Sequence, residues 1–242
     1  LRILSLAANE LNGTISPAIR FLTKLELLDY AVNNFNGSIP TELCELQHLH
    51  IVNLYMCGLS GTIPSNIGNM SKLITLNTFN NSIEGQIPQS MGNLNYLRRL
   101  NLGKNKLSGT LPSSLGRLQK LNYFDMTQNF LTGTIPESFS SLRNLSIIYL
   151  DENELVGPVD VLCGMTNATQ LYFTTNYLTG TLPACLGNHV FLKEIYLDDN
   201  KFTGTIPDSY GDLKEMVYFE VDLNILTGTI PESLASATKL RK

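Results

Sequence analysis

The sequence predicts an α/β solenoid, a right-handed superhelix of ten coils with a parallel β-sheet on its concave side and short helical turns on its convex side. Two observations carry this prediction. Glycine recurs every 24 residues from Gly13 to Gly157 and, after one step of 23 residues, from Gly180 to Gly228. Apolar residues recur in the same units, and one unit cannot bury them alone, so neighbouring coils must stack. The units start at residues 1, 25, 49, 73, 97, 121, 145, 168, 192 and 216, and we expect residues 1–242 to form a single solenoid.

The composition is that of a folded chain. The 242 residues are 43% hydrophobic and 16% charged, with a net charge of −4. The apolar runs are only a few residues long, so we expect no membrane insertion by this segment. A mildly acidic chain has no general attraction for nucleic acid, and we expect none to bind. The charge is uneven: residues 1–144 hold 11 basic and 8 acidic residues, and residues 145–242 hold 6 and 13.

Each part of the 24-residue unit predicts one element. Positions 3 to 8 alternate between apolar and polar residues, which is the pattern of a half-buried strand. Strands stacked at about 4.7–4.9 Å per coil would make a sheet roughly 45–50 Å long. Position 9 is asparagine in nine units and Cys57 in the third, and a buried amide can satisfy backbone groups where the strand turns. Glycine at position 13 permits a close turn, and proline at position 16 deflects the chain towards a short helical turn over positions 17–24.

Two units depart from this pattern. In unit one the proline, Pro17, comes one place late. Unit seven is one residue short and reads Pro158-Val159-Asp160 where the others carry x-Ile-Pro. At unit seven we expect ordinary drift of a repeat, and a local kink of the solenoid is the alternative.

Written out, the unit is L-x-x-L-x-L-x-x-N-x-L-x-G-x-I-P followed by L-x-x-L, and residues 97–118 are a clean copy. The chain resembles the plant-specific type of leucine-rich repeat protein, found in receptor-like kinase and receptor-like protein ectodomains and in polygalacturonase-inhibitor-like proteins. The resemblance implies an extracellular or cell-surface glycoprotein that is not an enzyme, takes no cofactor, and binds a protein or peptide on its concave face. Proteins of this family carry cysteine-paired caps, and none is recognisable here, so we expect a fragment of a longer protein.

The cysteines and the glycosylation sequons bear on the compartment. We expect the four cysteines to be free buried thiols. A Cys163–Cys185 bridge between adjacent coils is the alternative, but the positions of these two cysteines within the coil differ by about two residues, which should make their side chains diverge. Sequons for N-glycosylation begin at six asparagines: Asn12, Asn36, Asn69, Asn80, Asn144 and Asn167.

The concave face should carry the ligand, and two regions of it stand out. Three tyrosines share position 5 of successive units beside acidic residues at position 7, which suits a basic partner. A smaller aromatic patch precedes them. A tyrosine column can also serve only to stabilise the sheet by stacking between strands. The predicted ligand-binding residues are Tyr149, Tyr172, Tyr196, Asp151, Asp198 and Asp222, and, in the second region, Tyr55 and Phe79.

Other functions are weaker alternatives. Paired carboxylates can hydrolyse glycosides, but on an open sheet nothing would desolvate them. A calcium site among Asp198, Asp199 and Asp222 would lack any binding-loop motif, so we expect no metal. A structural or surface-coating protein is the remaining class. It includes ice binding, because Thr-Gly-Thr recurs at positions 12 to 14 and could form a flat ladder, interrupted at Glu84, Gln86, Val156 and Pro158.

Overall fold

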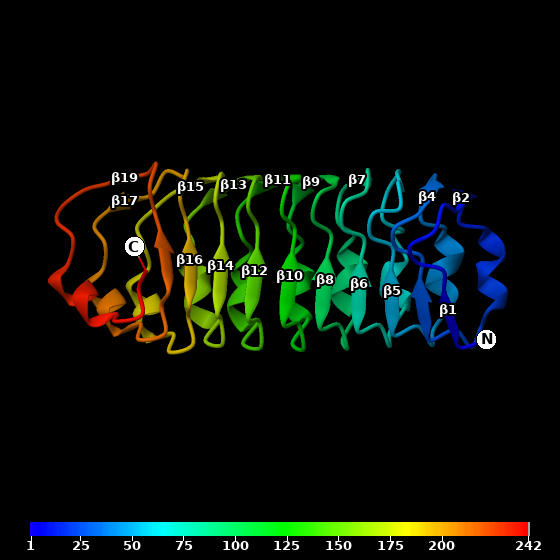
Figure 1. Cartoon of the computed structure of the whole chain (residues 1–242), viewed down its shortest axis with the longest axis horizontal. Coiled ribbons are helices and arrows are strands. Elements are labelled where there is room, and N and C mark those ends of the chain that lie inside the picture. The colour runs from blue at the N-terminus through cyan, green and yellow to red at the C-terminus, as the bar shows by residue number, and fades with distance from the viewer. Residues whose placement is uncertain (242) are drawn as a thin grey trace.

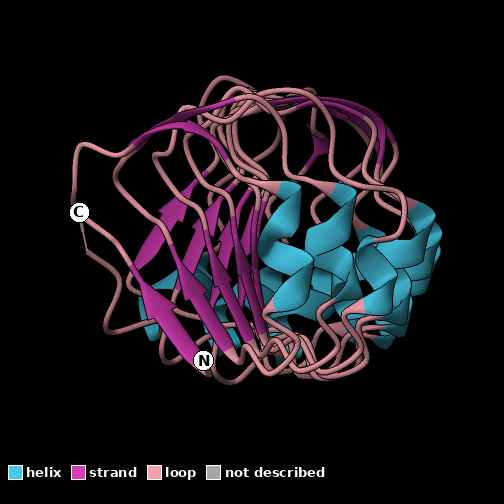
Figure 2. Cartoon of the chain, turned by 90° about the vertical axis from the view of Figure 1, so that its right-hand side faces the viewer, coloured by secondary structure: helices cyan, strands magenta, loops and turns pink. Residues whose placement is uncertain are grey.

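The computed structural model describes residues 1–241 and forms the predicted solenoid. Ten coils follow one another along the long axis, from the blue amino-terminal end to the red carboxy-terminal end (Figure 1). Seen along that axis, the main sheet lines one side, the helices line the opposite side, and a second set of short strands bridges the two (Figure 2). Among the described residues, no helix has the length and apolar character needed to cross a bilayer.

The main sheet contains one strand from every coil, all parallel and in sequence order. Leu28, for example, pairs with Leu4 on one side and with Val52 on the other. The repeat fixes this register because each strand must turn the same apolar position inward. The strands are β1 (Ile3–Ser5), β3 (Leu27–Asp29), β5 (Ile51–Asn53), β6 (Thr75–Asn77), β8 (Arg99–Asn101), β10 (Tyr123–Asp125), β12 (Ile147–Tyr149), β14 (Gln170–Tyr172), β16 (Glu194–Tyr196) and β18 (Tyr218–Glu220).

Shorter strands near the repeated glycine of each unit form smaller parallel sheets along one edge. In coil three only a bridge between Thr62 and Glu84 forms, and Gly58 in that coil has a φ of 78°. The short strands are β2 (Asn12–Thr14), β4 (Asn34–Asn36), β7 (Glu84–Gly85), β9 (Lys106–Thr110), β11 (Phe130–Gly133), β13 (Glu154–Gly157), β15 (Tyr177–Leu178), β17 (Thr203–Gly204) and β19 (Ile225–Leu226).

The helical turns of the convex side are short 3₁₀ helices. Most begin after the repeated proline, whose extended backbone cannot continue a strand ladder. They are η1 (Pro17–Phe21), η2 (Thr41–Glu45), η3 (Ile67–Asn69), η4 (Gln89–Asn93), η5 (Ser113–Arg117), η6 (Glu137–Ser141), η7 (Asp160–Gly164), η8 (Ala184–Asn188), η9 (Asp208–Asp212) and η10 (Glu232–Ser236).

A buried asparagine ladder holds the turn that ends each main strand. The residue before it has a positive φ in every coil, from 56° at Ala8 to 51° at Leu223. Asn129 donates to the carbonyls of Leu102 and Met126 and accepts the Leu107 N–H. These bonds offset the cost of the left-handed turn. In coil three the Cys57 thiol takes the place of the amide and donates to the Tyr30 carbonyl at 3.2 Å.

The expectation of four free thiols is wrong, because Cys163 and Cys185 form a disulfide across coils seven and eight, with Cα atoms 5.6 Å apart. The offset of about two residues between the positions of Cys163 and Cys185 in their coils predicted that the two side chains diverge. Neighbouring 3₁₀ helices are in fact staggered by that same offset: a Cβ added to Gly92 would lie 2.6 Å from the Ser114 Cβ in the next coil. Cys44 and Cys57 are free and buried, and burial raises the pKa of both thiols.

Candidate functional site

Tyrosine side chains form a continuous row along the concave sheet. Consecutive ring centroids lie 5.8, 4.7, 4.4 and 6.3 Å apart, and each ring comes from the next strand, from β10 to β18. All five rings are half-buried, so each keeps surface for a partner. We call this set the tyrosine row: Tyr123, Tyr149, Tyr172, Tyr196 and Tyr218.

The structure brings together the three tyrosines that the sequence singled out and adds one at each end. Tyr123 and Tyr218 stand at position 3 of their units, whereas the prediction from the sequence followed position 5 alone. Positions 3 and 5 of a strand point to the same face, because side chains alternate with a period of two. The two columns taken together contain the whole row.

Three hydroxyl groups of the row donate to acceptors, namely those of Tyr123, Tyr149 and Tyr172. The Tyr172 hydroxyl donates to Glu194 Oε2, and the Tyr149 hydroxyl donates to Gln170 Oε1 at 3.1 Å. Burial, the bonded Glu194 carboxylate and neighbouring charges raise the pKa of Tyr172, and burial and nearby carboxylates raise the pKa of Tyr149. The row therefore offers fixed aromatic faces with polar edges, as a recognition surface requires.

Threonine hydroxyls link the acidic column beside the row. Thr127 Oγ1 donates to Asp151 Oδ2 at 3.4 Å, and the Thr174 N–H donates to Asp151 Oδ1 at 3.0 Å. Thr174 Oγ1 then donates to Asp198 Oδ1 at 2.8 Å. Burial is the main cause that raises the pKa of Asp151 to about 7, and the Asp125 carboxyl adds to it. This column holds its acids in place before any partner arrives.

The negative charge is densest at the last two coils. Carboxylate oxygens of Asp198, Glu220 and Asp222 all lie within 4.8 Å of one another. Asp199, which the sequence-based calcium alternative included, is not a member of this group and stands in the strand-ending turn with a φ of 51°. Like charges held this close favour a cationic group on a binding partner.

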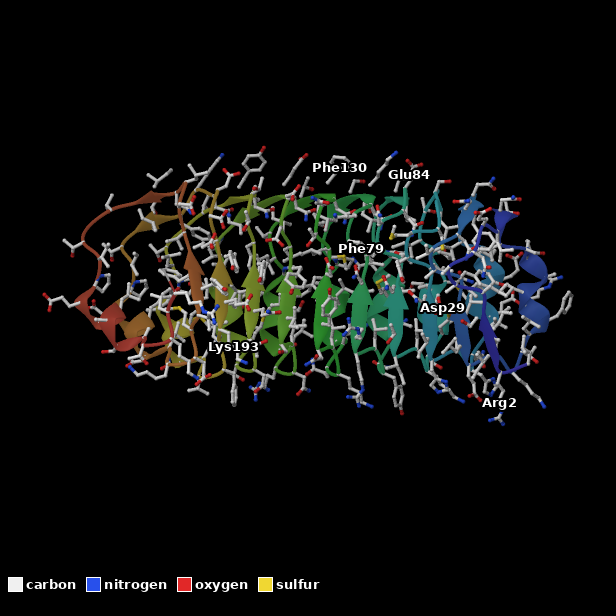
Figure 3. The ribbon with its side chains drawn as sticks, in the orientation of Figure 1. Arg2, Asp29, Phe79, Glu84, Phe130 and Lys193 are labelled. Carbon is white, nitrogen blue, oxygen red and sulfur yellow. A yellow bond between two sulfur atoms is a disulfide. The ribbon has the colours of Figure 1, made fainter. Side chains whose placement is uncertain are left out.

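The second predicted region lies next to the tyrosine row and is continuous with it. Tyr55 and Phe79 line an open hollow of about 250 Å³ together with Tyr123, and Asn77, Asn101 and Asp125 complete its lining. Figure 3 shows Phe79 among the main strands, with Glu84 and Phe130 at the edge formed by the short strands. The structure thus places all eight predicted ligand-binding residues on one face, from coil three to coil ten.

Comparisons with known proteins place this geometry in a family. The family model described as leucine rich repeat matches residues 95–155, and a second, shorter leucine rich repeat model matches residues 48–70 and 191–213. The ectodomain of the Arabidopsis thaliana membrane receptor kinase GASSHO1/SCHENGEN3, solved in complex with CASPARIAN STRIP INTEGRITY FACTOR 2, is 37% identical with a TM-score of 0.96. The chain is a plant-type leucine-rich repeat protein resembling receptor ectodomains.

Two further structures resemble this leucine-rich repeat chain. The Arabidopsis receptor kinase HAESA ectodomain, solved with a peptide hormone ligand, is 31% identical with a TM-score of 0.93. A plant ice-binding protein is 27% identical with a TM-score of 0.85. The alignments cover 99%, 99% and 94% of this chain but only 29%, 40% and 74% of the receptor kinase, HAESA and ice-binding chains respectively. No curated protein sequence matches.

The leucine-rich repeat coils also display the predicted glycosylation sites. All six sequon asparagines (Asn12, Asn36, Asn69, Asn80, Asn144 and Asn167) are exposed. Asn144 and Asn167 donate their side-chain amides to the backbone carbonyls of Gln119 and Arg143 in the preceding coil. A glycan at Asn80 would stand at the end of a concave strand, beside Phe79, so its use would restrict ligands there. Attachment at all six stays a prediction.

Proposed function

We propose that this chain is a non-catalytic recognition module that binds a basic protein or peptide segment on its concave face, at the extracellular side of a cell. The observation that carries the proposal is the tyrosine row with its acidic neighbours. The contact surface consists of Tyr149, Tyr172 and Tyr196 with Asp151, Asp198 and Asp222, which we call the tyrosine–acid face.

Preorganisation favours tight binding at this face. The main strands fix the tyrosine rings, and the Thr127 and Thr174 hydroxyls fix the carboxyls of Asp151 and Asp198, so little ordering is left for the moment of binding. Tyrosine contributes large contact area at a low entropic cost, and arginine or lysine can stack on its ring. Residues 145–242, which carry all of this face, have an excess of acidic residues that attracts a cationic partner.

The similar proteins support the same proposal. HAESA was solved with a peptide hormone bound, and the GASSHO1/SCHENGEN3 ectodomain with a factor bound. Both are ectodomains of plant membrane receptors, and the Cys163–Cys185 disulfide is suited to an oxidising extracellular setting. Since this chain spans less than half of either, we extend to it only ligand binding.

A capture experiment tests the proposal. The purified chain is immobilised, exposed to a native extracellular plant extract, and the retained peptides are identified by mass spectrometry. A matched surface carries the Tyr149→Ala, Tyr172→Ala and Tyr196→Ala substitutions. We expect a basic peptide or protein to be retained by the wild type and lost from the variant, because the variant removes three contact rings and leaves the buried core intact.

Titration calorimetry with the synthetic form of the captured peptide completes the test. The double variant Tyr172→Ala/Tyr196→Ala should weaken binding by about tenfold or more while unfolding as cooperatively as the wild type. Equal affinity for the wild type and the folded double variant would refute the tyrosine–acid face. If the captured partner is a wall-degrading enzyme, the same face would serve an inhibitor.

A specific observation favours ice binding as a second candidate. Threonines of neighbouring coils pair along the short strands, Thr110 with Thr132 and Thr181 with Thr203. The methyl groups of Thr181 and Thr205 lie over the glycine of the next coil, 3.0 Å and 2.8 Å from where a Cβ on Gly204 and on Gly228 would stand. This packing gives a regular hydroxyl and methyl array, and the similar plant ice-binding protein supports the idea.

Crystal growth in the presence of the chain tests this candidate. The wild type should shape ice crystals, and Thr181→Tyr/Thr205→Tyr should abolish the shaping by breaking the flat array. The same double variant should bind the captured peptide normally. Ice crystals that grow unshaped with the wild type would eliminate the candidate.

A further inference from the structure

A glycine lets two walls of the hollow lie close to the concave sheet. Position 7 carries a side chain in nine coils and is glycine only in coil five, at Gly103. A Cβ placed on Gly103 would lie 3.2 Å from Phe79 Cδ2 and 2.7 Å from Asp125 Oδ1. Any other residue would therefore push Phe79 and Asp125 out of place. Both of these residues line the hollow of about 250 Å³, together with Tyr55 and Tyr123, so the shape of the hollow depends on glycine at position 103.

Charges around the hollow select a neutral occupant. Lys104 Nζ lies 5.6 Å from the centroid of the Phe79 ring, and Arg99 Cζ lies 4.3 Å from that of Tyr123. In the lining of the hollow, the buried Asp125 carboxyl accepts bonds from the Thr127 N–H and the Tyr123 hydroxyl. Cations at the rim oppose a lysine or arginine, and the acid beside the hollow opposes a carboxylate. Three aromatic walls favour an apolar side chain instead.

The hollow and the acidic group of Asp198, Glu220 and Asp222 lie on the same sheet, separated along the solenoid axis. The hollow is centred at coil five, and Asp198, Glu220 and Asp222 belong to coils nine and ten. Four to five coil spacings of about 4.8 Å separate the two sites by roughly 19–24 Å. An extended peptide advances about 3.3 Å per residue, so about six residues span that distance. The tyrosine row lies between them and would contact those six residues.

We propose that the hollow beside Gly103 is a specificity pocket, and that the ligand is an extended peptide segment with an apolar side chain seated there and a lysine or arginine about six residues away at the carboxylates of coils nine and ten. This inference rests on the peptide-binding function proposed above and specifies its ligand. It assigns Phe79 and Gly103 to specificity, and the acidic group to the charge of the partner.

A random peptide library tests the spacing even though the natural ligand is unidentified. Phage displaying random linear 12-residue peptides are selected on the immobilised chain, and the enriched peptides are synthesised for calorimetry. We expect the enriched sequences to pair an apolar residue with lysine or arginine at a separation of five to seven residues. Gly103→Leu, which displaces Phe79 and Asp125 from the walls of the pocket, and Phe79→Ala, which removes one wall, should each weaken binding about tenfold or more.

The control introduces leucine at the same position of the repeat unit, position 7, but far from the pocket. The variant Ala7→Leu, in coil one, should bind the peptide as tightly as the wild type does. Replacing the apolar peptide residue by serine should cost as much as Gly103→Leu, and combining the two changes should cost no more than either. Phe79→Ala keeps the test valid should Gly103→Leu fail to fold.

Two results would overturn the inference in different ways. Enriched basic peptides that bind Gly103→Leu and Phe79→Ala as tightly as the wild type, yet are lost on Tyr172→Ala/Tyr196→Ala, would refute the pocket and leave the proposed function intact. Enrichment no greater than on a blank surface would refute both.

Discussion

At the scale of single residues, Asp151 is the most perturbed carboxyl of the concave face. Its side chain is partly buried against the sheet and accepts bonds from Thr127 and Thr174, which lie in the two neighbouring coils. The bonds favour the charged form, but burial and the Asp125 carboxyl outweigh them and raise the pKa of Asp151 to about 7. The face can therefore gain charge on passing from acid to neutral pH.

This carboxyl makes stability depend on pH. In the unfolded chain Asp151 should titrate near pH 4, so the folded state binds the extra proton between about pH 4 and pH 7. The contribution of Asp151 to the free energy of unfolding is therefore greatest below pH 4 and is lost as the pH rises through about 7. Asp151→Asn should flatten the pH dependence of the free energy of unfolding across that window, as measured by urea titration.

At the scale of elements, the 3₁₀ helices are tied to one another by side-chain bonds to the preceding coil. Ser114 Oγ donates to the Gln89 carbonyl, and Ser138 Oγ donates to the Ser113 carbonyl. The same place in coil eight is taken by Cys185, which bonds covalently to Cys163 in the shortened coil seven. At the 23-residue step of the repeat, the disulfide thus supplies the link that a serine supplies in coils four, five, six, nine and ten.

Removing the bridge should destabilise the solenoid at coils seven and eight. Cys163→Ala/Cys185→Ala should lower the free energy of unfolding by about 3 kcal/mol, since the bridge closes a loop of about 20 residues. Thermal unfolding followed by circular dichroism measures the shift, and reduction of the wild type should reproduce it. Cys44→Ser, at a free buried thiol, should respond to reductant as the wild type does. An unchanged midpoint for the double variant would show that packing alone holds this step.

At the scale of the whole molecule, the stacking of coils converts a charge difference along the sequence into one along the solenoid axis. The excess of acidic residues in 145–242 collects at one end, where Asp198, Glu220 and Asp222 converge. The more basic first part carries Arg99 and Lys104 near its boundary with that end. A bound peptide would therefore be oriented by charge as well as by shape.

Binding of a cationic probe should depend on salt. A hexalysine peptide should bind the wild type in about 50 mM NaCl and lose about tenfold in affinity by about 500 mM, because salt shortens the range of exposed charges. Hexaglutamate should not bind at either concentration. Asp198→Asn/Asp222→Asn should weaken the low-salt affinity, measured by fluorescence anisotropy, while Glu42→Gln on the convex side should not. Affinity independent of salt would contradict an electrostatic role for the acidic group.

The repeat in the sequence determined the coil number, the strand register, the buried asparagine ladder and the face on which Tyr149, Tyr172 and Tyr196 lie. It could do so because a period of 24 residues forces equivalent residues of successive coils on top of one another, so one-dimensional spacing becomes three-dimensional position.

Only the tertiary structure decided how different positions of neighbouring coils meet. The stagger of the convex helices paired Cys163 with Cys185, and the lateral approach of side chains from coils three to six made the hollow beside Gly103. These contacts depend on the offset between coils and on where side chains point, and neither quantity is contained in the period of the repeat.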